Sequence, residues 1–334
     1  MLRPETRERW FGYEHAFDDP VTLVATIAMG AVLLATPVVI LILSRTRRIN
    51  AATRTELLRR YATWLVITPV LLIPILLGAF WTILGVTALS LLCYREYARA
   101  TGLFREKLVS LLVTLGILAV NFAVLDHWYG FFQALTPLCV VTIAALSILV
   151  DRPRGYIQRV ALGVFGFTLF GTCLAHLGYI ANDARYRPVL ILIFLSVELN
   201  DVFAFIVGKT LDRHKLMPQT SPNKTLAGSM GALMLTTVLV MLLGSAVFAG
   251  TKMDSPWLLA GLGAIISVAG QLGDLMLSSI KRDLGIKDMG VLLPGHGGLL
   301  DRFDSLILVA PAAFHYIGYV LGFGLDQQVR ILTM

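Results

Sequence analysis

Most of this sequence consists of apolar stretches that are long enough to cross a lipid bilayer as helices. A spanning helix needs about 20 predominantly apolar residues, because it rises only about 1.5 Å per residue through a hydrocarbon core about 30 Å thick. Only 15% of the 334 residues are charged, whereas about a quarter are charged in soluble domains. The run 61–94 is too long for one helix and is divided at Gly78. The candidate spans are residues 21–43, 61–77, 80–94, 108–125, 131–150, 160–180, 189–207, 226–248, 257–277 and 306–323. We therefore predict an all-α, polytopic integral membrane protein with about ten transmembrane helices.

The basic residues are distributed unevenly between the two sides of this predicted membrane domain. If successive loops alternate sides, 21 of the 28 Lys and Arg residues lie on one side and 7 on the other. Basic loops remain in the cytoplasm, which places there residues 45–60, 95–107, 151–159, 209–224 and 281–302. We therefore expect a multi-pass protein of the inner (plasma) membrane with both termini facing outward. The net charge of +7 follows from this bias and does not indicate a nucleic-acid partner. We expect residues 44–60 to be a topology-setting loop rather than an interfacial helix.

The polar motifs are concentrated in the last part of the chain. We therefore expect one membrane domain over residues 1–334, in which residues 1–190 form a lipid-facing scaffold. Residues 191–334 form the catalytic part, with cytoplasmic motif loops at 209–225 and 278–304. The chain has no visible internal repeat, which argues against a transporter built from inverted repeats.

Residues 273–304 place charges of both signs at a membrane edge, where they are costly unless hydrated, paired or bound to a ligand. Carboxylates suit a hard cation, and Lys and Arg suit phosphate oxygens. The turn at 294–298 contains Pro and Gly residues, which let backbone N–H groups approach an anion. A basic loop that only sets topology would not explain three aspartates beside a glycine turn. The segment therefore predicts a phosphoryl- or nucleotidyl-transfer site. Its candidate catalytic residues are Asp274, Lys281, Arg282, Lys287, Asp288, His296, Asp301, Arg302 and Asp304.

A second polar group lies in residues 198–228. Carboxylates inside a membrane are functional-site candidates, and Asp201 lies at a depth from which it can approach the cytoplasmic site. Glu198 is equally well explained by packing. Lys224 and Thr225 immediately precede a predicted helix, whose N-terminus is a natural anion site. The candidate substrate-binding residues are Asn200, Asp201, Ser221, Lys224, Thr225, Gly295, Gly297 and Gly298.

Together these motifs resemble the phosphatidate cytidylyltransferase (CDP-diacylglycerol synthase) family. The resemblance is specific over residues 198–304. Earlier helices match only in hydropathy, apart from residues 95–97, which resemble the polar end of an early hairpin of the family. The chain departs from many bacterial members at Leu277, where they carry an acidic residue, and at Ala227, where they carry an acidic or amide residue. The matching residues are Asn200, Asp201, Ser221, Pro222, Lys224, Thr225, Gly228, Ser278, Lys281, Arg282, Lys287, Asp288, Pro294 to Gly298, Asp301, Arg302 and Asp304.

The resemblance implies that a cytidylyl group passes from CTP to phosphatidate, giving CDP-diacylglycerol and pyrophosphate in phospholipid biosynthesis. We expect Mg²⁺ to be bound by Asp274 and Asp301, with a second cation left open, and the Lys and Arg residues to bind phosphates. The expected partners are CTP, phosphatidate or a similar lipid phosphate and membrane lipids, and a homodimer is left open. Two alternatives stay open. One is another CTP-dependent membrane enzyme acting on a different lipid phosphate or a polyprenol, and the other is a transporter of an anionic solute.

Overall fold

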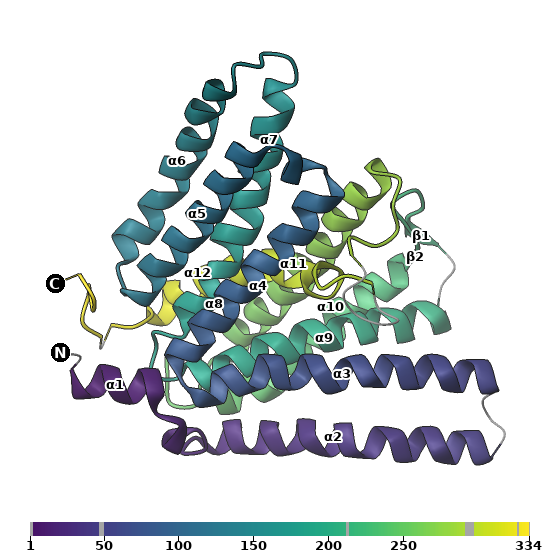
Figure 1. The fold of residues 1–334 in the computed structure, drawn as a ribbon. Helices are drawn as coiled ribbons and strands as arrows, with labels where there is room; N and C mark the ends of the chain where they lie inside the picture. The colour runs from purple at the N-terminus through teal and green to yellow at the C-terminus, as the bar shows by residue number, and fades with distance from the viewer. Residues whose placement is uncertain (1–2, 47–49, 212–213, 291–296, 326, 334) are drawn as a thin grey trace.

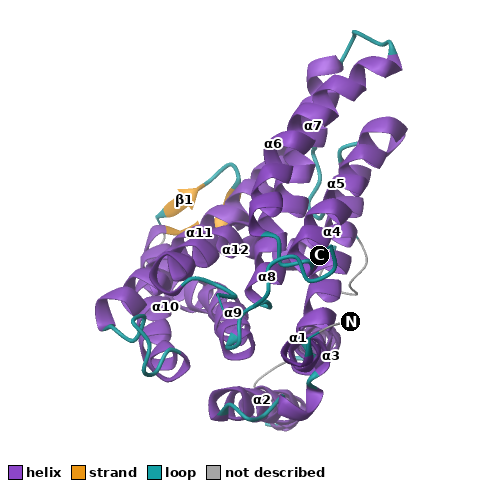
Figure 2. Cartoon of the chain, turned by 90° about the vertical axis from the view of Figure 1, so that its left-hand side faces the viewer, coloured by secondary structure: helices purple, strands orange, loops and turns teal. Residues whose placement is uncertain are grey.

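The computed structural model describes residues 3–46, 50–211, 214–290, 297–325 and 327–333 and is almost wholly helical (Figures 1 and 2). Its first half contains α1 (Pro4–Phe11), α2 (Pro20–Arg45), α3 (Ala51–Leu77), α4 (Ala79–Ala100), α5 (Lys107–Leu125) and α6 (Tyr129–Leu146). One continuous helical segment follows, made of α7 (Tyr156–Gly166), a π-helical stretch (Phe167–Cys173) and α8 (Leu174–Ile180). The last part contains α9 (Tyr186–Leu211), α10 (Leu226–Val247), α11 (Pro256–Asp283) and α12 (Leu300–Leu321).

The predicted all-α membrane fold is confirmed. Among the described residues, nine helical segments are long and apolar enough to cross a membrane. Each corresponds to one of the ten predicted spans. The remaining predicted span corresponds to α4, which is helical throughout but ends in the polar residues Arg95, Glu96 and Arg99. The protein is therefore a multi-pass membrane protein.

Two details differ from the sequence-based expectation. Residues 51–60 are not a loop but the first turns of α3, because Asn50 accepts a hydrogen bond from the Thr53 N–H (2.8 Å) and no Gly or Pro interrupts them. The loop after α9 contains a short antiparallel hairpin of β1 (Lys215–Met217) and β2 (Ser221–Thr225), in which Lys215 pairs with Thr225. This hairpin leads directly into α10.

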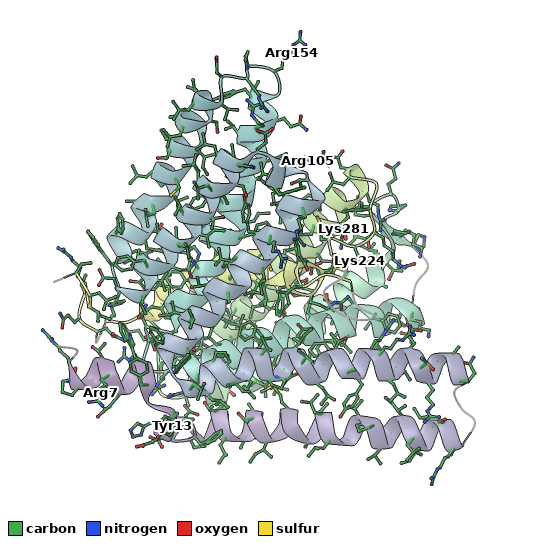
Figure 3. The ribbon with its side chains drawn as sticks, viewed as in Figure 1. Arg7, Tyr13, Arg105, Arg154, Lys224 and Lys281 are labelled. Carbon is green, nitrogen blue, oxygen red and sulfur yellow. The ribbon has the colours of Figure 1, made fainter. Side chains whose placement is uncertain are left out.

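The helix ends are sorted between two sides of the molecule. The last turn of α2, the first turn of α3, the C-terminal ends of α4, α9 and α11 and the hairpin all lie to the right or top in Figure 1, and both termini lie at the left. Arg105, Arg154, Lys224 and Lys281 share the former side, whereas Arg7 and Tyr13 lie at the latter (Figure 3). This arrangement is the one that the alternating-loop prediction requires. Which side is cytoplasmic stays a prediction.

Close helix contacts bring the motif-bearing elements together. A Cβ atom added at Gly273 of α11 would lie 2.6 Å from the Asp304 carbonyl oxygen of α12, so these helices touch through backbone. In the same way, a Cβ at Gly228 of α10 would lie 2.5 Å from the Ala204 carbonyl oxygen of α9. Glycine at these two positions therefore permits α9, α10, α11 and α12 to converge at one end of the molecule.

Candidate functional site

The first pair of charged residues in the site joins the end of β2, just before α10, to α11. The Nζ of Lys224 lies 2.6 Å from Oδ2 of Asp274. The hydroxyl of Ser278, one turn further along α11, donates to Oδ1 of Asp274 at 3.2 Å. The Lys224 and Asp274 side chains are 22% and 23% exposed, although the Nζ atom of Lys224 is itself buried. As predicted, Lys224 lies just before a helix N-terminus, where Thr225 Oγ1 accepts from the Gly228 N–H at 3.1 Å.

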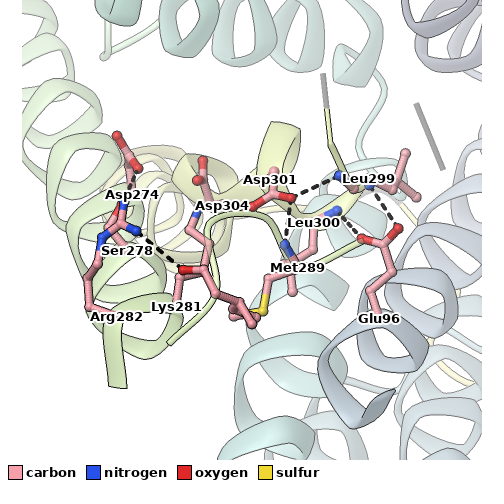
Figure 4. Close-up of polar contacts among 12 residues, drawn as sticks. Glu96, Asp274, Ser278, Lys281, Arg282, Met289, Leu299, Leu300, Asp301 and Asp304 are labelled. Atoms are coloured by element: carbon pink, nitrogen blue, oxygen red, sulfur yellow. Dashed lines mark hydrogen bonds and ion pairs between the residues drawn. The ribbon is translucent and has the colours of Figure 1, made fainter. Parts of the chain in front are cut away.

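The second pair joins α11 to α12 and is more deeply buried. The Nζ of Lys281 lies 2.8 Å from Oδ1 of Asp301, with the two side chains 10% and 4% exposed. Oδ2 of Asp301 accepts from the backbone N–H groups of Met289 (2.8 Å) and Gly298 (2.9 Å). Gly297, immediately before Gly298, has a φ of +83°, which favours glycine. Asp301 therefore ties both ends of the connection between α11 and α12 to the start of α12 (Figure 4).

Two more aspartates lie near these pairs. Asp304 is one turn after Asp301, is 6% exposed and accepts from the Ser305 N–H at 2.8 Å. Asp274, Asp304 and Asp201 of α9 are close enough to repel one another electrostatically. Arg302 is exposed and close enough to attract Asp201. Three helices therefore contribute carboxylates to one acidic region that basic side chains border.

This donor set suits a hard divalent cation, which prefers carboxylate oxygens. In the part of the chain that the structure describes, no three His, Cys, Asp or Glu side chains are arranged as a metal site. Lysine Nζ atoms instead contact Asp274 and Asp301. Both oxygens of Asp274 and Oδ1 of Asp301 accept one contact each and keep a second lone pair, whereas Oδ2 of Asp301 already accepts two N–H groups, so Asp301 can bind a cation only through Oδ1. The assignment of Asp274 and Asp301 as metal ligands stays a prediction.

The remaining predicted site residues are placed as follows. Arg282 donates from Nε to the Thr220 carbonyl at 3.3 Å and thereby links α11 to the hairpin. Lys287 and Asp288 are exposed after the end of α11. Ser221 begins β2 and pairs with Met217. The positions predicted to shape a turn around pyrophosphate are only partly visible, because Gly295 and His296 lie outside the described residues.

Asn200 has structural contacts that its predicted role in substrate binding did not anticipate. It is 1% exposed, and its Oδ1 accepts from Thr236 Oγ1 (3.0 Å) and Ser267 Oγ (2.6 Å). Gln271 extends this network by donating from Nε2 to Ser267 Oγ at 3.0 Å. These bonds join α9, α10 and α11 inside the membrane domain. They account for a buried amide without a substrate, and the predicted contact of Asn200 with substrate stays untested.

Sequence reasoning did not place Glu96 in the site. Its Oε1 accepts from the Leu299 N–H at 3.0 Å and its Oε2 from the Leu300 N–H at 2.8 Å (Figure 4). The resemblance of residues 95–97 to the polar end of an early family hairpin was the available signal. It gave no indication of the partner, because the contact spans 203 residues of sequence.

A profile of the Cytidylyltransferase family matches residues 58–320, from α3 to the last turns of α12. The chain belongs to this family. The resemblance that the motifs indicated is therefore confirmed at the family level. The match includes every described residue of the site. The protein is a membrane-embedded nucleotidyltransferase that uses CTP.

Similar proteins include an Escherichia coli (strain K12) protein, "Uncharacterized protein YnbB", which is 33% identical over 249 residues, or 72% of this chain and 81% of the relative. A phosphatidate cytidylyltransferase of Staphylococcus aureus (strain COL) is 48% identical over 118 residues, or 35% of this chain and 44% of that protein. The one of Staphylococcus epidermidis is 40% identical over 155 residues, or 44% of this chain and 58% of that protein. The matched part thus spans about half the length of the named enzymes.

Proposed function

We propose that this protein transfers the cytidylyl group of CTP to phosphatidate, forming CDP-diacylglycerol and pyrophosphate. The observation that supports this proposal best is the convergence of the Lys224–Asp274 and Lys281–Asp301 pairs at one end of α10, α11 and α12. The reaction must bring two polyanions together, so a site for it needs cations close to the phosphates. The names of the staphylococcal relatives agree with this substrate.

In the proposed reaction, an oxygen of the lipid phosphate attacks the α-phosphorus of CTP. The bond from the α-phosphorus to the oxygen that bridges to the β-phosphorus breaks, and pyrophosphate leaves with that electron pair. The nucleophile is already an anion, so a strong general base is not required. When held by Asp274 and Asp301, Mg²⁺ supplies positive charge that offsets the charge on the phosphates.

The chain's own residues then have separate tasks. Lys224 lies at the end of β2, just before the N-terminus of α10, where helix N–H groups add to its positive charge, and it binds phosphate there. Asp288 and Asp304 orient the groups around the two pairs, and Gly297 and Gly298 shape the turn around pyrophosphate. The acyl chains enter sideways from the bilayer. The further phosphate-binding residues are Lys281, Arg282, Lys287 and Arg302.

We also propose that the site faces the cytoplasm, where CTP is available. The support is the bias of basic residues and the sorting of helix ends seen in Figure 1. The termini then face the outer side of the inner membrane.

The test is a transfer assay with purified protein in vesicles that contain phosphatidate. CTP labelled at the α-phosphorus should give labelled lipid and one pyrophosphate per lipid product, and Mg²⁺ should be required. CTP labelled at the γ-phosphorus should leave the lipid unlabelled. Label from the γ-phosphorus in a polyprenol would instead show a kinase. Transfer to a different lipid phosphate in preference to phosphatidate would refute the proposed acceptor but not cytidylyl transfer.

A further inference from the structure

Glu96 lies in a part of α4 that neighbouring helices hold in place. On one side of it, the Tyr94 hydroxyl donates to Ser110 Oγ of α5 at 3.0 Å. On the other side, Tyr97 is 1% exposed and its hydroxyl donates to the Leu162 carbonyl of α7 at 3.2 Å. The Cα position of Glu96 is therefore fixed by two helices that do not belong to the site.

The carboxylate of Glu96 binds the start of α12. The first N–H groups of a helix have no partner within the helix, and a negative charge near them is stabilising. Glu96 accepts from two of them, those of Leu299 and Leu300, with one oxygen each. Asp301 accepts from the N–H groups of Gly298 and Met289. The two carboxylates thus divide four backbone donors between them.

Two glycines leave the space that this carboxylate occupies. A Cβ atom at Gly298 would lie 2.4 Å from Oε2 of Glu96, and one at Gly290 would lie 2.6 Å from Oε1. Both distances are too short for any side chain to be tolerated without movement. The backbone on each side of the connection from α11 to α12 is therefore packed directly against Glu96, and Gly290 and Gly298 meet there.

We propose that Glu96 is a positioning residue that sets the start of α12 and, through it, the place of Asp301 and its ion pair with Lys281. Glu96 itself does not touch the phosphates. The inference rests on the proposed function only for its effect on turnover, because the contacts of Glu96 with α12 are independent of the lipid acceptor. If Glu96 has this role, the N-terminal helices do more than form a scaffold, since α4 holds the start of α12 in place.

The test compares Glu96→Gln with Glu106→Gln as a matched control. Glu106 is also at the polar end of the helices, but its carboxylate faces Arg159 (Oε2 to Nε 3.8 Å) and not α12. The glutamine at position 96 keeps the shape but offers one acceptor oxygen, and its NH₂ group faces a backbone N–H. We expect amide hydrogen exchange at Leu299 and Leu300 to rise by roughly 10-fold to 100-fold in Glu96→Gln, the range for losing a hydrogen bond to a charged group, and not in Glu106→Gln.

Turnover is measured in the same preparations and divided by the number of CTP-binding sites, so that misfolded protein does not contribute. We expect kcat of Glu96→Gln to fall by at least about 10-fold with the KM for lipid unchanged. Glu96→Asp, which keeps both acceptor oxygens, should recover part of the lost kcat. Unchanged exchange at Leu299 and Leu300, or a loss of turnover that disappears after this correction, would overturn the proposal. If exchange changes as expected but even the unaltered protein does not use phosphatidate, the acceptor is wrong and the role of Glu96 stands.

Discussion

Replacing Asp301 or Asp274 by asparagine should produce different losses of stability, because the structure holds the two carboxylates differently. Asp301 is 4% exposed and accepts from Lys281 and from two backbone N–H groups. Asp274 is 23% exposed and accepts from Lys224 and Ser278. Asparagine keeps the shape of each side chain and removes one acceptor oxygen and the charge.

The size of each loss follows from these surroundings. In Asp301→Asn the amide NH₂ must face either the Lys281 ammonium or the two N–H groups, so a buried donor loses its acceptor. Breaking a buried ion pair in this way costs about 3–5 kcal/mol. The Nζ of Lys224 is also buried, but the Lys224 and Asp274 side chains are more exposed (22% and 23%) than those of the other pair, so the loss of this pair should cost less. Asp301→Asn should therefore have the clearly lower thermal midpoint in detergent.

Activity should fall in both variants by about 10²-fold to 10³-fold, as expected when a charge-stabilising group is lost from a transfer site. If both residues bind Mg²⁺, raising its concentration should restore part of the turnover, because mass action offsets weaker binding. Asp254→Asn, an exposed aspartate before α11, is the matched control and should change neither property.

The assay is a Mg²⁺ titration of transfer, with the thermal midpoint measured on the same samples. Full activity at ordinary Mg²⁺ in either variant would remove that residue from the metal site. Equal midpoints for the two variants would refute the reasoning from burial.

Three further changes test other parts of the structure. Lys224→Ala should raise the KM for CTP by about 10-fold or more, because a charged hydrogen bond to phosphate is lost, with little change in the thermal midpoint; an unchanged KM in well-expressed protein would remove Lys224 from the site. A cysteine placed at Arg185 should react with an impermeant reagent added outside the cell and one at Lys215 should not, and the reverse pattern would overturn the proposed orientation. Gly228→Ala should destabilise the protein by about 1–3 kcal/mol, because its Cβ would meet the α9 backbone. The control is Gly30→Ala in α2, where an added Cβ meets nothing within 4 Å, and it should not change the stability. Equal thermal midpoints for the two variants would contradict the close contact of α9 and α10.

The sequence by itself determined the helices, because crossing a bilayer requires a length of apolar chain that can be read locally. Each predicted span corresponds to a helix, and the divided run 61–94 does turn at Gly78, whose φ is +136°. The sequence also determined the family, since the motif residues lie close together along the chain. Helix limits were less predictable, and residues 51–60 joined α3 because capping by Asn50 outweighed their polarity.

Only the tertiary structure decided which side chains meet. The sequence supplied several lysines and aspartates but could not say that Lys224 pairs with Asp274 and Lys281 with Asp301. Nor could it place Glu96 against the start of α12, 203 residues away. Hydropathy depends on each segment alone, whereas these contacts depend on how closely helices approach. That approach is set by positions such as Gly273, where the backbones of α11 and α12 touch.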